Sequence, residues 1–70
     1  MKIEELEQIF TYHAPKGDQT ERYVAIREAV KAAAVVINQH CPESREKSLA
    51  ITNLQQASMM ANAAIAIHEA

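Results

Sequence analysis

The chain has 70 residues, a net charge of −2 and a single cysteine. A chain of this length forms one domain, here residues 1–70, and buries only about 60% of its unfolded surface, so a lone copy is marginally stable. Cys41 has no second cysteine to pair with, which excludes a disulfide and leaves a metal or self-association as the stabilising device. The acidic balance, with a pI of about 5.8, argues against polymeric nucleic acid as a partner.

The first residues, Met1 to about Ile9, have the pattern of a short docking helix that ends near Phe10 or Thr11. Four apolar residues at spacings of three, three and one share one helical face: Ile3, Leu6, Ile9 and Phe10. Pro15 and Gly17 then favour a loop. This segment lacks the basic region and apolar stretch of a signal peptide, so we expect a cytoplasmic protein.

A long helix is predicted from about Gln19 to His40. Asp18 and Glu21 have the spacing of a capping box at its start. Its main apolar stripe is Tyr23, Ile26, Val30, Ala33 and Ile37. Further alanines and valines cover much of the remaining circumference, so this helix should be buried on more than one side.

A second long helix is predicted from Arg45 to near Glu69, after a break at Pro42 and a cap at Ser44. No residue between Lys47 and His68 is charged, but the stretch has too many polar groups for a lipid-facing span. These polar residues are Ser48, Thr52, Asn53, Gln55, Gln56, Ser58 and Asn62. No membrane partner is therefore expected.

Two stripes on the second long helix indicate two neighbours. One stripe contains Ala50, Leu54, Ala57, Ala61, Ala64 and Ile65, and the other contains Leu49, Met60 and Ile67. The short connection makes the first neighbour the preceding helix, in an antiparallel hairpin. The second neighbour is expected to be another copy of the chain. The predicted fold is all-α, a short N-terminal helix followed by a two-helix hairpin that oligomerises.

Catalytic and metal chemistry find little support. His13, His40 and His68 are far apart and lack cysteine or aspartate at ligand spacing, so neither a metal nor another cofactor is expected. No nucleophile stands beside a base, and Gly17 alone makes no phosphate-cradling loop. We interpret the chain as a non-enzyme with no catalytic residue.

One group of residues has the composition of a binding site for a flat, anionic ligand. It comprises Tyr12, His13, Pro15, Lys16, Arg22, Tyr23 and Arg27. A tyrosine ring can stack on a base, and basic side chains can neutralise phosphate. The structural alternative is that Tyr23 belongs to the core, Arg22 pairs with a glutamate and the loop only turns the chain. From spacing alone, this alternative is the stronger interpretation.

The run FTYHAPKGDQTERYVAIREA, followed by CPESREKSLAITNLQQASMMANAAIA, resembles the small helical-hairpin sponges that phages use against CBASS and Thoeris immunity. The resemblance covers residues 10–66. It implies a protein that sequesters cyclic nucleotide messengers without cleaving them, binding cyclic dinucleotides such as cGAMP at subunit interfaces of a homo-oligomer, commonly a hexamer. Some relatives also bind cyclic trinucleotides at separate pockets.

The resemblance also implies roles for individual residues. Tyr12 matches the base-stacking aromatic and Arg27 the phosphate-binding basic residue, while His13, Pro15 and Lys16 match the family's loop. Met60 stands where many relatives have tryptophan, and Ile67 where several have arginine. The resemblance therefore does not extend to a second pocket of the trinucleotide-binding type. The competing hypothesis is a helical-hairpin adaptor or structural protein that binds another protein.

Overall fold

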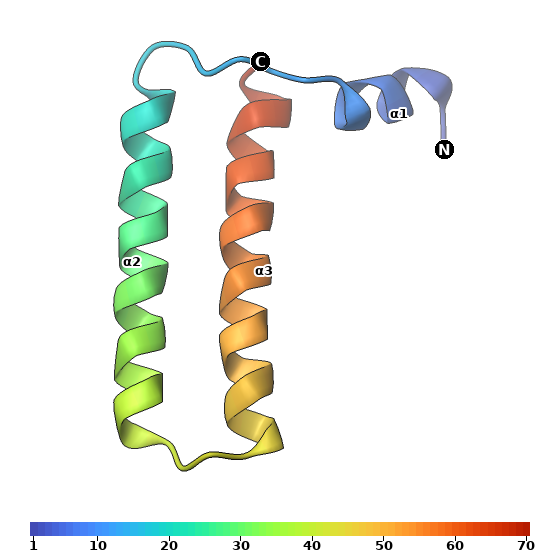
Figure 1. Cartoon of the computed structure of the whole chain (residues 1–70). Coiled ribbons are helices and arrows are strands. Elements are labelled where there is room, and N and C mark those ends of the chain that lie inside the picture. The colour runs from blue at the N-terminus through green and yellow to red at the C-terminus, as the bar shows by residue number, and fades with distance from the viewer.

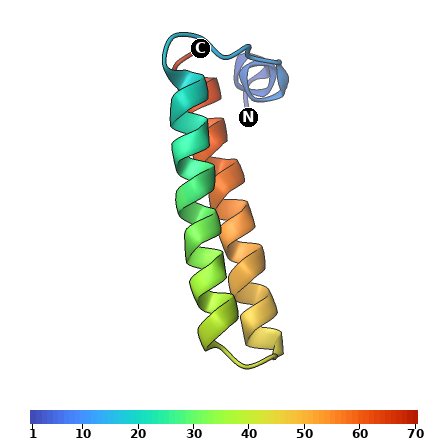
Figure 2. The ribbon, with the colours of Figure 1, turned by 60° about the vertical axis from the view of Figure 1, so that its left-hand side comes forward.

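A computed structural model describes all residues, 1–70, and contains three helices and no strand: α1 (Ile3–Phe10), α2 (Gln19–His40) and α3 (Arg45–His68). Figure 1 shows α2 and α3 side by side and antiparallel, with α1 set apart beside the end of α3. The view in Figure 2 confirms that α1 lies outside the hairpin. The predicted all-α hairpin with a short preceding helix is confirmed.

The short helix α1 is attached to the end of α3 by a side chain. Gln8 Nε2 donates a hydrogen bond of 2.9 Å to the Ile67 carbonyl. The chain leaves helical geometry at Thr11, whose hydroxyl donates to the Glu7 carbonyl in the preceding turn. The apolar face of α1 is largely uncovered, since Ile3 and Phe10 are 66% and 82% exposed.

The start of α2 differs from the predicted capping box. Asp18 precedes the first helical residue, but its side chain makes no capping hydrogen bond. The reason is its backbone, with φ −88° and ψ 8°, because a capping side chain needs an extended residue. The preceding Gly17 has φ +57°, a left-handed conformation that glycine adopts readily. The Asp18 carboxylate instead lies 3.7 Å from Arg22.

The connection between α2 and α3 has the predicted cap: α3 begins directly after Ser44. The Ser44 hydroxyl accepts a hydrogen bond of 3.1 Å from the Lys47 amide, which caps α3. The Lys47 ammonium donates to the Asn38 carbonyl at 3.1 Å and to the Glu43 carboxylate at 2.6 Å. Lys47 is only 9% exposed, and its ammonium makes these two hydrogen bonds, which helps to fix the turn end of the hairpin, residues 41–44.

The contact face between the long helices is rotated slightly from the predicted stripes. On α2 four of the five predicted stripe residues are partly buried: Tyr23, Ile26, Val30 and Ile37. The fifth, Ala33, is exposed, and its neighbour Ala34 is partly buried in its place. On α3, Ala57 and Ala64 are exposed. The partly buried α3 residues are Ala50, Ile51, Leu54, Ser58, Ala61, Asn62, Ala63, Ala66 and Ile67 beside the buried Ile65. At about 100° per residue, Ala57 and Ala64 fall at the edge of this face, so they are free to contact another molecule.

The hairpin leaves many large apolar side chains uncovered. Ile65, at 8% exposure, is its only buried apolar residue. The accessible surface is 5500 Å², against about 4400 Å² expected for a compact chain of this mass. Large exposed apolar residues along the hairpin are Val24, Val35, Val36, Leu49, Met59 and Met60. None of the helices combines the length and apolar character needed to cross a membrane.

Candidate ligand-binding site

A pocket of about 450 Å³ lies at the open end of the hairpin, where α2 begins and α3 ends. We call it the open-end pocket. Its walls come from three segments: the loop of residues 11–18, the first turns of α2 and the last turns of α3. The lining residues are Tyr12, His13, Pro15, Tyr23, Arg27, Asn62, Ala63 and Ala66. Five of the seven predicted site residues therefore meet around one space.

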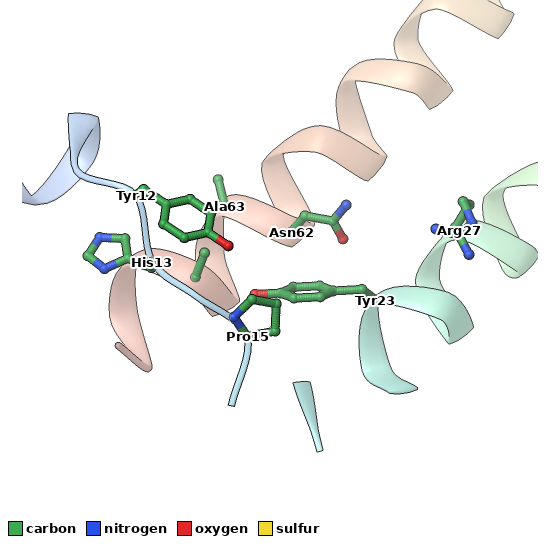
Figure 3. Close-up of a pocket in the computed structure, with 8 residues that line it drawn as sticks. Tyr12, His13, Pro15, Tyr23, Arg27, Asn62 and Ala63 are labelled. Carbon is green, nitrogen blue, oxygen red and sulfur yellow. The ribbon is translucent and has the colours of Figure 1, made fainter. Parts of the chain in front are cut away.

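Two aromatic side chains from different elements face this pocket. Tyr12 stands on the loop and is 82% exposed, whereas Tyr23 on α2 is partly buried. In Figure 3 the Tyr23 ring extends from α2 toward Pro15. A ring with one free face can stack on a nucleobase or another flat group. Tyr12 has the free surface for this contact, and Tyr23 forms part of the wall.

Arg27 supplies the positive charge of the open-end pocket. It lies one turn beyond Tyr23 on α2, so the two side chains are neighbours on the same helical face. Arg27 is exposed and makes no ion pair within the chain. A guanidinium in this state can form charge-assisted, bidentate hydrogen bonds with a phosphate.

The remaining two predicted site residues, Lys16 and Arg22, lie outside the pocket lining. Arg22 makes two hydrogen bonds with the Glu69 carboxylate, of 2.7 Å and 2.9 Å. Hydrogen bonding with Glu69 raises the pKa of Arg22 further above its ordinary value, and the same contact lowers the pKa of Glu69. The structure thus contains the glutamate pairing that the alternative interpretation of Arg22 requires.

The loop is fixed by hydrogen bonds to its neighbours. His13 Nε2 lies 2.9 Å from the Gln8 carbonyl, which connects the loop to α1. The Lys16 amide donates to Gln19 Oε1 at 3.1 Å, and Gln19 Nε2 donates to the Glu69 carbonyl at 3.0 Å. Gln19 is 5% exposed, so its amide joins the loop to the end of α3 away from water.

Asn62 is a pocket residue that sequence reasoning did not select. Its Oδ1 atom is buried and has no hydrogen-bond partner. Figure 3 places its amide beside the Tyr23 ring. In the sequence Asn62 is one of seven polar residues on the uncharged stretch between Lys47 and His68, and nothing in that pattern distinguishes the one that faces the loop. Pairing the two long helices as an antiparallel hairpin places Asn62 opposite Tyr23, and this pairing could have identified Asn62 as a pocket residue.

A second pocket, of about 530 Å³, lies between α1 and the end of α3. We call it the α1 pocket. Its lining is Glu5, Gln8, Ile9, Met60, Ala63, Ile67 and His68. Met60 and Ile67, the two positions at which the resemblance implies a departure from the family pattern, both line this pocket. The lining has no arginine or lysine that could bind a phosphate.

Nothing in the geometry resembles a metal centre. No three histidine, cysteine or acidic side chains come together in a way that could hold a metal ion. Of the three histidines, only His13 reaches the open-end pocket, and its Nε2 is engaged with a backbone carbonyl.

The fold and this pocket together define a helical-hairpin module whose open end presents aromatic rings and a cation to a small ligand. The sequence profile of the Acb2/Tad1 hairpin domain matches residues 1–66, and the chain belongs to that family. This is the family of anti-CBASS and anti-Thoeris sponges that the sequence resembles, binding proteins rather than enzymes. No curated protein and no solved structure matches the chain.

Proposed function

We propose that the chain is a phage anti-defence sponge that sequesters cyclic oligonucleotide second messengers, cyclic dinucleotides such as cGAMP above all, without cleaving them. Family membership supports the class of function. The observation that carries the proposal is the grouping of Tyr12, Tyr23 and Arg27 around the open-end pocket. A stacking surface and an unpaired cation are the two features that a cyclic nucleotide requires.

In this proposal Tyr12 stacks on a base and Arg27 binds a phosphate. Stacking on an aromatic side chain contributes about 1–3 kcal/mol per base. Hydrogen bonds to a charged group contribute about 1.5–3 kcal/mol. The loop that carries Tyr12 is already tied to α1 and α2 by the contacts of His13 and Lys16, which lowers the cost of ordering it on binding.

The sponge is proposed to act as a homo-oligomer, with the hexamer of its relatives as the expected form. The uncovered apolar surface of α2 and α3 supports self-association, because a chain with one buried apolar residue lacks a core of its own. A symmetric interface repeats each residue on both sides. Two copies can thus bring two Tyr12 and two Arg27 to one ligand with two bases and two phosphates.

The side chains around the pocket support the proposal of binding without cleavage. Hydrolysis of a phosphodiester needs a base or a nucleophile that is free to act. His13 is the only imidazole in the lining, and its Nε2 is held by the Gln8 carbonyl. Capture is stoichiometric, so the sponge must be abundant in the cytosol of the infected cell and bind below the signalling concentration.

The test is calorimetric titration of the full chain with cyclic dinucleotides, cyclic trinucleotides and cyclic ADP-ribose isomers. The complex is then denatured and the ligand recovered. Tight binding of one class with release of the intact ring is the expected result. Recovery of a linear product indicates an enzyme, and absence of binding across the panel overturns the proposal. Trinucleotide binding alone points to the α1 pocket, where Met60 and Ile67 lie.

The competing adaptor hypothesis also has support from the structure, because the exposed apolar side chains of α2 and α3 suit a protein partner. It predicts that Tyr12→Ala and Arg27→Ala leave activity intact. A charge introduced at the exposed Ala57 destroys activity in either case if it breaks the assembly. The Arg27→Ala variant therefore separates the two hypotheses.

A further inference from the structure

We propose that Glu69 is a positioning residue for the ligand: it holds Arg22 and Gln19, and through them fixes the loop that brings Tyr12 and Pro15 to the open-end pocket. This inference rests on the proposed function and deepens it. Glu69 lies beyond residue 66, where the family match ends, so the family pattern does not include this residue. The inference also assigns Arg22 a role other than contact with the ligand.

The contacts form a continuous path from α3 to the loop. The backbone carbonyl of Glu69 accepts a hydrogen bond from Gln19 Nε2. Gln19 Oε1 in turn accepts a hydrogen bond from the backbone amide of Lys16. Lys16 directly follows Pro15, which lines the pocket. Gln19 is 5% exposed and uses both ends of its amide, so its side chain has one well-defined arrangement. The position of Glu69 is therefore transmitted to the loop.

The carboxylate of Glu69 adds a second tie to the same place. It accepts one hydrogen bond from each terminal nitrogen of Arg22, and this bidentate geometry fixes the orientation of the two side chains as well as their distance. Asp18 also lies 3.7 Å from Arg22, and Lys16 is a further positive group near Glu69. The positive charges of Arg22 and Lys16 compensate the negative charge of Glu69, which would otherwise repel a ligand phosphate.

Arg22 itself is poorly placed to bind the ligand. It is absent from the pocket lining, and both of its terminal nitrogens are already bonded to Glu69. Arg27 has neither restriction. The two arginines of α2 therefore have different roles: Arg27 binds the ligand, and Arg22 orders the loop. A loop ordered in advance loses less freedom when the ligand binds.

The decisive experiment compares Glu69→Gln with a charge-swapped double variant, Arg22→Glu with Glu69→Arg, in the full chain. Glu28→Gln, at an exposed position of α2, is the matched control. Affinity for cGAMP is measured by calorimetry and oligomeric mass by native mass spectrometry. We expect Glu69→Gln to weaken binding about two- to fivefold, because the ion pair with Arg22 is partly exposed. The swap restores the pair but places a glutamate at position 22 beside Asp18 and an arginine at position 69 near Lys16. It should therefore recover only part of the affinity that Glu69→Gln loses.

Other outcomes overturn the inference. If Arg22 contacts phosphate directly, Glu69→Gln tightens binding by releasing Arg22, and the swap leaves binding weak. Unchanged affinity in Glu69→Gln likewise overturns a positioning role. Mass and helix content equal to the wild type exclude a general folding defect as the cause of weakened binding.

A readout without ligand separates this inference from the proposed function. Backbone amides of residues 12–14 and 16–19 should exchange with solvent faster in Glu69→Gln than in Glu28→Gln. If the wild type does not bind cGAMP or any other cyclic nucleotide, the proposed function fails, and this exchange still decides whether Glu69 orders the loop. Equal exchange in the two variants overturns the ordering role, whatever the wild type binds.

Discussion

The two ends of the hairpin are held by different kinds of contact. At the turn end, hydrogen bonds join residues that are close in sequence, such as Ser44 to Lys47 and Lys47 to Asn38. At the open end, Arg22 and Gln19 bond to Glu69 across 47 and 50 residues. The turn end can therefore form from local sequence, whereas the open end forms only after α2 and α3 have paired. In the proposed function, ligand binding depends on the long-range contacts of the open end.

Each end relies on one buried polar side chain. Lys47 is 9% exposed at the turn end, and Gln19 is 5% exposed at the open end. Both make two side-chain hydrogen bonds. Because Ile65 is the only buried apolar residue, these polar contacts help to fix how α2 and α3 are arranged at the two ends of the hairpin. Substitutions can affect one end without the other, and the following predictions use that independence.

The largest effect is expected from Ile65→Ala, which removes the most buried apolar side chain in the last turn of α3. Loss of a buried isoleucine costs about 2–4 kcal/mol, including the cavity it leaves. Ile3→Ala makes the same change at a side chain that is 66% exposed. Its expected cost is about 0.5 kcal/mol or less. Urea unfolding followed by circular dichroism at fixed protein concentration measures both, and equal losses would contradict the assignment of the core.

The next effect concerns ligand at the open end. Arg27→Ala removes the unpaired guanidinium and should weaken cyclic dinucleotide binding by about 10- to 150-fold, the equivalent of about 1.5–3 kcal/mol. Arg45→Ala, at the first residue of α3, is the control because it lies at the turn end. Calorimetry should separate the two variants, while native mass spectrometry shows the same assembly for both. Similar weakening in both variants would indicate general electrostatic attraction instead of a site.

A smaller effect is expected at the turn end. Ser44→Ala removes the side-chain cap of α3 and should cost about 1 kcal/mol of stability. Ligand affinity at 25 °C should not change, because the open-end pocket contains no residue of the turn. Ser48→Ala is the control: this exposed serine lies within α3 and caps nothing. Thermal unfolding and calorimetry on the same samples test this independence, which fails if Ser44→Ala weakens binding more than Ser48→Ala does.

The sequence predicted what local chemistry determines. The bounds of α2, the break at Pro42 and the cap at Ser44 all depend on neighbouring residues, and all three are confirmed. The capping box at Asp18 was wrong because the left-handed Gly17 turns the chain before the helix and leaves Asp18 non-extended. Local pattern cannot separate these two ways of starting a helix.

Long-range contacts account for most of what the sequence did not predict. Asn62 enters the pocket, and Glu69 pairs with Arg22, only because α3 returns beside the start of α2. The exact rotation of the contact face, with Ala34 partly buried in place of Ala33, depends on how both helices pack. The roles of the five lining residues that were predicted stay predictions until a ligand is measured.

The smallest expected effect is a pH dependence confined to the open end. The Arg22 guanidinium lowers the pKa of Glu69 below its ordinary value. A carboxyl group with a lowered folded pKa adds stability above its unfolded pKa of about 4.3, and this stability is lost as pH falls through the folded value. Order in the loop should thus be complete near neutral pH and decrease in acid below about pH 4.

The size of this acid transition is limited by solvent. The side chains of Arg22 and Glu69 are 40% and 46% exposed, so water and salt screen their attraction. The side-chain amide resonance of Gln19, followed by NMR from pH 7 to pH 2.5, should report the transition because Gln19 bonds to the Glu69 carbonyl. Glu69→Gln should lack this transition. If the variant titrates as the wild type does, another acid controls the loop, and Asp18, 3.7 Å from Arg22, is the next to substitute.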